Sequence, residues 1–124
     1  MTKIDYDTAV KDVQEIIKGR EDYVYVNPFG KKAGGEDGLN CYYFDPNNGQ
    51  PSCIVGHVFA KHGVTFEDVG VMNDNCIMDA IYVAGIDLDY QTRYFLEAIQ
   101  ERQDSGVPWG ESVSRTMKED FSGD

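Results

Sequence analysis

The side chains of this sequence best suited to chemistry are one cysteine and two histidines that follow it closely, Cys53, His57 and His62. Cys53 is predicted near the start of a helix, where the helix dipole favours a thiolate, and cysteine hydrolases use that placement. His57 follows one turn later, with its side chain directed back towards Cys53. A nucleophile also needs a base positioned independently of it, whereas both histidines lie on the same predicted helix. We therefore favour a buried structural cysteine, with a hydrolase on Cys53 as the weaker alternative.

The same three residues raise the question of a zinc site. Cys53 and His57 share one helix face, but His62 drifts off it, and Cys41 would have to supply the fourth ligand. The close paired spacings typical of structural zinc sites are absent. The run at 45–49 (DPNNG) resembles a calcium loop only superficially, because a glycine stands where the bidentate glutamate is required. We interpret it as a turn and expect neither a metal nor a cofactor.

Residues 29–40 (FGKKAGGEDGLN) are the one locally basic, glycine-rich stretch, and we predict a mobile hairpin loop there. Lysines and exposed glycine amides can hold a phosphate, so a nucleotide-like ligand is the alternative use of this loop. It is neither a P-loop nor a dinucleotide fingerprint, because a strand and a helix do not flank it in the required order. The candidate ligand-binding residues, which would act with nearby tyrosines at an oligomer interface, are Lys31, Lys32, Gly34 and Gly35.

The charge of the chain is strongly negative and unevenly spread. The formal net charge is −11, and the stretch between Lys61 and Arg93 holds six acids and no lysine or arginine. Such a surface repels phosphate backbones, so we expect no direct binding to nucleic acid. A soluble acidic surface is the simplest interpretation. The functional alternatives are a face that meets a basic protein surface and a mimic of nucleic acid towards a protein that binds it. The candidate acidic contacts are Glu67, Asp68 and Asp74.

Size and composition indicate one soluble domain that spans residues 1–124. The chain has 124 residues, of which 41% are hydrophobic, enough to fold without a metal or a disulfide. Its three cysteines are odd in number and lack close spacing, and the first residues contain no apolar signal segment. No apolar run approaches the length of a membrane span. We expect a cytoplasmic protein with reduced thiols.

The elements that must position these residues follow from apolar periodicity and turn residues. The predicted fold is α+β and mostly helical, with one antiparallel two-stranded hairpin. Its strands are residues 23–26 and 41–44, which pair across the glycine-rich loop. The predicted helices begin at Asp5 or Asp7, at Ser52, at Thr65, near residue 75, at Asp89 and at Pro108, and the tail at 120–124 is predicted to be disordered.

The only tryptophan, Trp109, has two interpretations. It shares one face of the last predicted helix with Val113 and Met117, which favours packing in the core. Tryptophan is also favoured at interface hot spots, so a surface anchor for a partner is the alternative.

Two segments, 51–57 (PSCIVGH) and 103–111 (QDSGVPWGE), together with the predicted strand pair, carry a resemblance to a known family. They look like a family of small uncharacterised proteins encoded by actinobacterial phages of the mycobacteriophage type. The likeness extends from about Tyr6 to Met117. It implies a protein made in the cytoplasm of an infected bacterium, and it supplies no functional residues.

Our leading hypothesis is therefore a non-enzymatic acidic phage accessory protein. It would bind and modulate a host or phage macromolecule, such as a defence or regulatory protein, without direct contact to nucleic acid or membrane. Small size, the acidic face and the lack of an assembled catalytic set support this interpretation. A nucleotide-like small-ligand binder or sponge that uses loop 29–40 is the alternative, and the Cys53 hydrolase is the weaker one.

Overall fold

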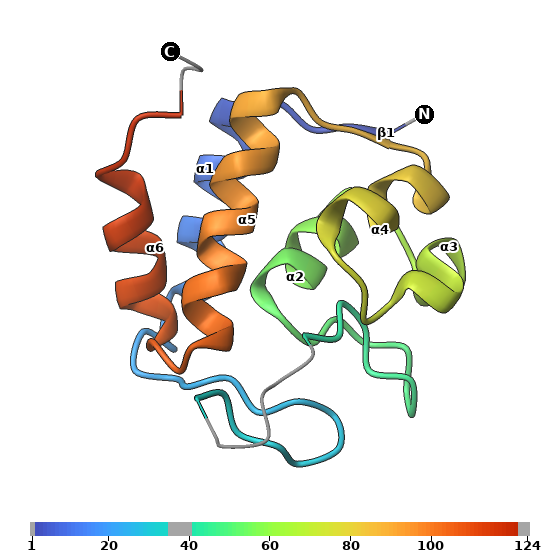
Figure 1. Ribbon diagram of the computed structural model, residues 1–124, viewed down its shortest axis with the longest axis horizontal. Coiled ribbons are helices and arrows are strands. Elements are labelled where there is room, and N and C mark those ends of the chain that lie inside the picture. Colours follow the sequence, from blue (N-terminus) through green and yellow to red (C-terminus); the bar gives the residue numbers. More distant parts are fainter. Residues whose placement is uncertain (1, 35–40, 122–124) are drawn as a thin grey trace.

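The computed structural model describes residues 2–34 and 41–121, and helices dominate this part of the chain. The elements are β1 (Thr2–Lys3), α1 (Tyr6–Ile17), α2 (Ile54–Lys61), α3 (Phe66–Val69), the 3-10 helix η1 (Gly70–Met72), α4 (Ile77–Ala84), β2 (Ile86–Asp87), α5 (Tyr90–Asp104) and α6 (Trp109–Met117). Helices α1, α5 and α6 pack together on one side, and α3 and α4 form a smaller group on the other (Figure 1). Within the described ranges, no helix is both long and apolar enough to cross a bilayer.

Helix α2 is buried on most of its circumference and packs against α1 and α5. Four of its apolar side chains have no exposed surface, namely Ile54, Val55, Val58 and Phe59. Its Gly56 lies directly against the backbone of Tyr43, where an added Cβ would stand 1.8 Å from the Tyr43 carbonyl oxygen. A helix that is apolar on most of its circumference is expected to be central, and α2 is.

The sheet is a parallel pair, and the predicted antiparallel hairpin is wrong. Strand β1 runs beside β2, so the start of the chain lies against the link between α4 and α5. Residues 23–26 and 41–44 form no ladder with each other, although both segments are described. They meet instead through a side chain, because the Tyr25 hydroxyl accepts a hydrogen bond from Tyr42 N at 3.3 Å.

The strand pairing fails because other groups occupy the backbone of residues 41–44. The side chain of Asn73 accepts a hydrogen bond from Phe44 N at 2.9 Å and donates one to Phe44 O at 2.7 Å. Tyr43 N donates to the Asn73 carbonyl at 3.1 Å, and Ser52 N donates to Tyr43 O at 2.9 Å. Since these partners satisfy the peptide groups, the segment gains nothing from a second strand.

Most helix ends follow the predicted capping residues. Asp5 accepts a hydrogen bond from Thr8 N at 2.8 Å at the start of α1, and Asp89 does the same for Thr92 N at 2.8 Å at the start of α5. Thr65, a predicted helix start, forms a capping box with Asp68. Gly85 ends α4 in the left-handed conformation, with φ of 70°.

Two helix starts and part of the tail differ from the prediction. Helix α2 is capped by Cys53 rather than Ser52, and α6 begins at Trp109, with Pro108 as its cap rather than its first residue. The predicted disordered tail contains Phe121, whose half-buried ring lies 5.9 Å from that of Phe95. Residues 122–124 lie outside the described residues.

The substitution Gly56→Ala tests the close approach of α2 to Tyr43. We expect it to lower the free energy of unfolding by about 3 kcal/mol or more, because the methyl group would meet rigid backbone. Gly19→Ala is the control, since a Cβ there meets nothing within 4 Å, and its φ of 84° should cost about 1 kcal/mol. Urea unfolding followed by circular dichroism measures both. Equal losses in the two variants would contradict the packing described.

Candidate functional site

Cys53 serves the structure of α2 rather than presenting a nucleophile. Its side chain is fully buried, and its Sγ accepts the hydrogen bond of Gly56 N at 3.4 Å, which caps the helix. Gln103 completes this end of the helix, since its Oε1 accepts from Ile54 N at 3.0 Å and its Nε2 lies 3.6 Å from the Cys41 Sγ. Burial first, and Cys53 second, raise the pKa of Cys41. The thiol of Cys41 is therefore protonated near pH 7 and serves as a packing group.

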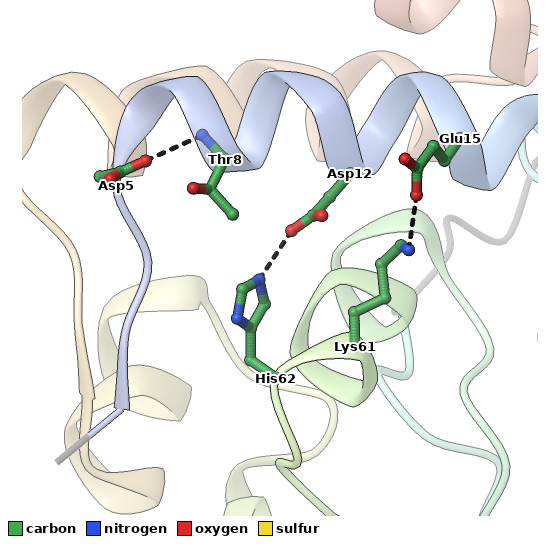
Figure 2. A network of polar contacts seen from close by, with 6 residues as sticks. All are labelled: Asp5, Thr8, Asp12, Glu15, Lys61 and His62. Carbon is green, nitrogen blue, oxygen red and sulfur yellow. Dashed lines mark hydrogen bonds and ion pairs between the residues drawn. The ribbon is translucent and has the colours of Figure 1, made fainter.

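His62 is engaged at the other end of α2, away from Cys53. Its Nε2 lies 2.7 Å from Oδ2 of Asp12 on α1, and the neighbouring Lys61 Nζ lies 2.8 Å from Oε2 of Glu15 (Figure 2). These two contacts fasten the C-terminal end of α2 to α1. Across residues 2–34 and 41–121, no group of three His, Cys, Asp or Glu side chains is arranged to hold a metal ion.

His57 points to a third environment, the start of α6. Its ring centroid lies 5.8 Å from that of Trp109, in an edge-to-face arrangement. Burial, and secondarily the positive charge of Arg20, lower the pKa of His57 to about 4. The imidazole is therefore neutral near pH 7. The three residues that suggested chemistry thus lie in three different surroundings, and the hydrolase arrangement is not assembled.

A polar pocket of about 310 Å³ opens beside His57, and we call it the Trp109 pocket. Its lining includes Arg20, Asp45, Asn48, Ser52, His57 and Trp109. Trp109 itself is only 1% exposed, so the prediction that it packs in the core is confirmed. Its burial leaves it unsuited to anchor a partner at the surface, which was the alternative interpretation.

The described residues of loop 29–40 that carry Lys31 and Lys32 form a hydrogen-bonded turn. The buried Asn27 accepts hydrogen bonds at its Oδ1 from Phe29 N at 2.9 Å and Lys31 N at 3.0 Å. Lys31 and Lys32 are exposed, while the backbone of Gly34 approaches the end of α5. Gly35 lies outside the described residues. A phosphate-binding role for this loop stays a prediction.

An apolar groove of about 630 Å³ lies between α4 and the start of α5, and we call it the α4–α5 groove. Its lining includes Met78, Ile81, Tyr82, Leu88, Tyr90 and Arg93. Several of these side chains face solvent, with Tyr82 87% exposed, Tyr90 70% and Met78 55%. This surface is not among the sites predicted from the sequence. The sequence does contain a sign of it, because Met78 and Tyr82, and likewise Tyr90 and Tyr94, are four residues apart and so share one face of their helices.

Arg93 organises the aromatic side of this groove. Its guanidinium carbon lies 5.5 Å from the ring centroid of Tyr90 and 4.7 Å from that of Tyr94. The two tyrosine rings are stacked, with centroids 6.0 Å apart. Glu97, one turn later on α5, lies 3.6 Å from Arg93 and balances its charge. The tyrosines are therefore held in place while their outer surfaces stay in water.

The predicted acidic contacts lie on the same side of the molecule, in and around α3 and α4. Glu67 is an exposed residue of α3, and Asp74 is exposed just after η1. Asp68 is exposed too, but its Oδ2 accepts from Thr65 N at 2.8 Å and is needed by the helix start. Asp87 and Asp89 line the groove itself. Two carboxylates therefore lie at the apolar groove, while Glu67, Asp68 and Asp74 are not among its lining residues.

Alkylation of the three cysteines tests the placement of Cys53. We expect iodoacetamide to modify the exposed Cys76 in the native protein while leaving the buried Cys41 and Cys53 intact. Mass spectrometry of the digested protein gives the rate at each site, and labelling in urea supplies the reference. A native rate at Cys53 above that of the unfolded chain would revive the hydrolase interpretation.

The stability of the protein should depend on pH through His57. Its folded pKa of about 4 lies below the ordinary value of 6.5, so the unfolded chain binds the proton more readily between these values. Stability is therefore fully present above pH 6.5 and falls as the pH is lowered towards 4, by about 1–2 kcal/mol after allowance for solvent. His57→Gln should remove this part of the pH dependence.

Asp104 titrates over part of the same range with the opposite sign. Burial raises its pKa to about 6 from 3.8, so the folded state binds that proton more readily. Urea unfolding of the parent and of His57→Gln across pH 4–7 separates the two, because only the difference between the proteins reports His57. Parallel stability curves would contradict the low pKa of His57.

Comparison with known proteins gives this chain no relative from which a function could be transferred. No protein-family model, no curated protein and no solved structure matches it. The resemblance to small phage proteins therefore stays a prediction. The function has to be argued from the contacts, exposure and charge of the described residues alone.

Proposed function

We propose that this protein is a non-enzymatic binding protein whose α4–α5 groove docks a basic, partly apolar segment of another protein. The groove would be the binding surface of the acidic phage accessory protein expected from the sequence, which modulates a host or phage macromolecule such as a defence or regulatory protein. The observation that carries it is the exposure of Tyr82 and Tyr90 beside an apolar groove with carboxylates at its edge.

The apolar part of the argument rests on residue type and on exposure. Tyrosine and arginine are enriched among interface hot spots, where rigid aromatic side chains provide large contact area. Tyr82 and Tyr90 expose most of their surface, and Met78 adds a flexible apolar side chain to the lining of the groove. A contiguous exposed surface of this kind marks an interaction site on a soluble protein.

The electrostatic part of the argument selects the partner. Residues 62–92 hold six acids without a lysine or arginine, and two of these acids, Asp87 and Asp89, line the groove. The nearby cation, Arg93, is balanced by Glu97 at 3.6 Å. A basic segment would therefore be attracted, whereas a second copy of this acidic chain would bring like charges together.

Binding rather than catalysis is proposed because the candidate chemical groups have structural tasks. Cys53 caps α2 in the core, and His62 is held by Asp12. His57 faces the Trp109 pocket instead of the thiol. A hydrolase would require these groups to meet at one accessible point.

A pair of designed peptides tests the proposal. We expect a peptide that alternates lysine and leucine to bind the parent protein, and one that alternates glutamate and leucine not to bind. Tyr82→Ser and Tyr90→Ser should each weaken the binding about tenfold or more, because the aromatic contact area is lost. Phe29→Ser is the matched control, since Phe29 is 61% exposed on a different part of the surface. Isothermal titration calorimetry measures all five combinations.

Charge reversal tests the electrostatic part separately. Glu67→Lys together with Asp74→Lys should weaken binding of the basic peptide and reduce its dependence on salt. Asp22→Lys, at an exposed residue outside the 62–92 stretch, is the control. Equal binding of a lysine–serine peptide would show that the groove contributes nothing. Dimers of the parent protein that Tyr82→Ser dissolves would identify the groove as a self-interface, and either result overturns the proposal.

A further inference from the structure

A second site, independent of the groove, lies where the chain segment after α1 meets the start of α6. The α4–α5 groove is at the beginning of α5, whereas the Trp109 pocket is beyond its end, so the length of α5 separates them (Figure 1). We propose that the Trp109 pocket binds a small zwitterion of the α-amino acid type, with its carboxylate at Arg20 and its ammonium group at Asp45.

One wall of the pocket is held rigidly against α6. Trp109 N donates a hydrogen bond to Tyr23 O at 2.9 Å, and Gly110 N donates to Glu21 O at 2.9 Å. The approach is so close that a Cβ on Gly110 would stand 2.7 Å from the Cβ of Glu21. These contacts use the unpaired N–H groups at the start of α6 and fix Arg20 and Tyr23 beside the indole.

The opposite wall is a closed turn. Gly49 N donates to Asp45 O at 2.7 Å, and Asp45 Oδ1 accepts from Asn47 N at 2.8 Å. Ser52 follows this turn, and its Oγ lies 2.8 Å from the Tyr25 hydroxyl, which is itself buried. The pocket is therefore formed by three segments that are each held by hydrogen bonds. A ligand would enter a preorganised site.

The donors in the pocket suit a carboxylate. Arg20 Nε donates to Ile16 O at 2.9 Å, and its guanidinium carbon lies 5.1 Å from the Trp109 ring centroid. No ion pair joins this guanidinium to an acid among residues 2–34 and 41–121, so its terminal amino groups remain for a bidentate contact. In the same part of the chain, Trp109 Nε1 is a buried donor without an acceptor. Because Trp109 is only 1% exposed, the carboxylate contact is assigned to the Arg20 guanidinium alone.

The remaining groups favour a zwitterion over a simple anion. Asp45 also lines the pocket, and its negative charge equals the positive charge of Arg20. His57 adds a neutral imidazole that can donate or accept. A multiply charged phosphate would face the Asp45 carboxylate without a second cation, whereas an ammonium group would pair with it. The volume of about 310 Å³ is at the small end of ligand sites and fits a molecule of amino-acid size.

The tryptophan itself reports on the site, because it is the only one in the chain. The common L-amino acids are titrated one at a time, up to about 10 mM, against the parent protein while the indole fluorescence is recorded. We expect at least one to cause a saturable change. For that amino acid, the N-acetyl derivative and the C-terminal amide should each bind about tenfold more weakly, since each lacks one charge.

Two variants connect the signal to the proposed contacts. Arg20→Gln and Asp45→Asn should each weaken binding about tenfold, and Lys18→Gln, an exposed change outside the pocket, should leave it unchanged. Thermal unfolding of each variant confirms that it is folded. The proposal is overturned if no amino acid gives a saturable change, if both derivatives bind as well as the parent compound, or if inorganic phosphate binds where amino acids do not.

Discussion

The close approach of Gly56 to the carbonyl of Tyr43 is the contact on which the remaining packing depends. Because the two backbones touch, α2 lies deep in the fold and must be covered by α1, α5 and the segment 41–44. A helix buried in this way leaves the peptide groups at its ends in need of partners. Cys53 and the side chain of Gln103 supply them at the N-terminal end, from two distant parts of the chain.

The same burial explains why the chemically capable side chains perform no chemistry together. The Cys53 Sγ is engaged in capping α2, and His62 contacts Asp12 at the C-terminal end of that helix. His57 projects from the helix between them and is desolvated against Trp109, which keeps its imidazole uncharged near pH 7. Each polar side chain of the helix therefore belongs to a different neighbour, and what remains available for binding lies elsewhere.

The two open surfaces proposed as binding sites among the described residues differ in physical character. The α4–α5 groove is apolar with two carboxylates, Asp87 and Asp89, in its lining, and it suits a macromolecular segment that combines positive charge with apolar side chains. The Trp109 pocket is small, polar and balanced in charge, and it suits a small molecule. Since α5 separates the two sites, occupation of one leaves the other accessible, and an amino acid could be bound while a protein partner is docked.

The sequence by itself determined the features that depend on neighbours along the chain. The caps at Asp5, Thr65 and Asp89 form as predicted because a short side chain reaches an amide three residues away, whatever the rest of the fold does. The tertiary structure decided every pairing between distant segments. The Asn73 side chain hydrogen-bonds the backbone of Phe44, which the predicted hairpin would have used, because side-chain amides and strand partners compete for the same peptide groups. Strand β1 pairs with β2, which is distant from it in the sequence. It also decided which aromatic residues are buried, since tyrosines at identical spacing can face the core or the solvent, and only packing selects between them.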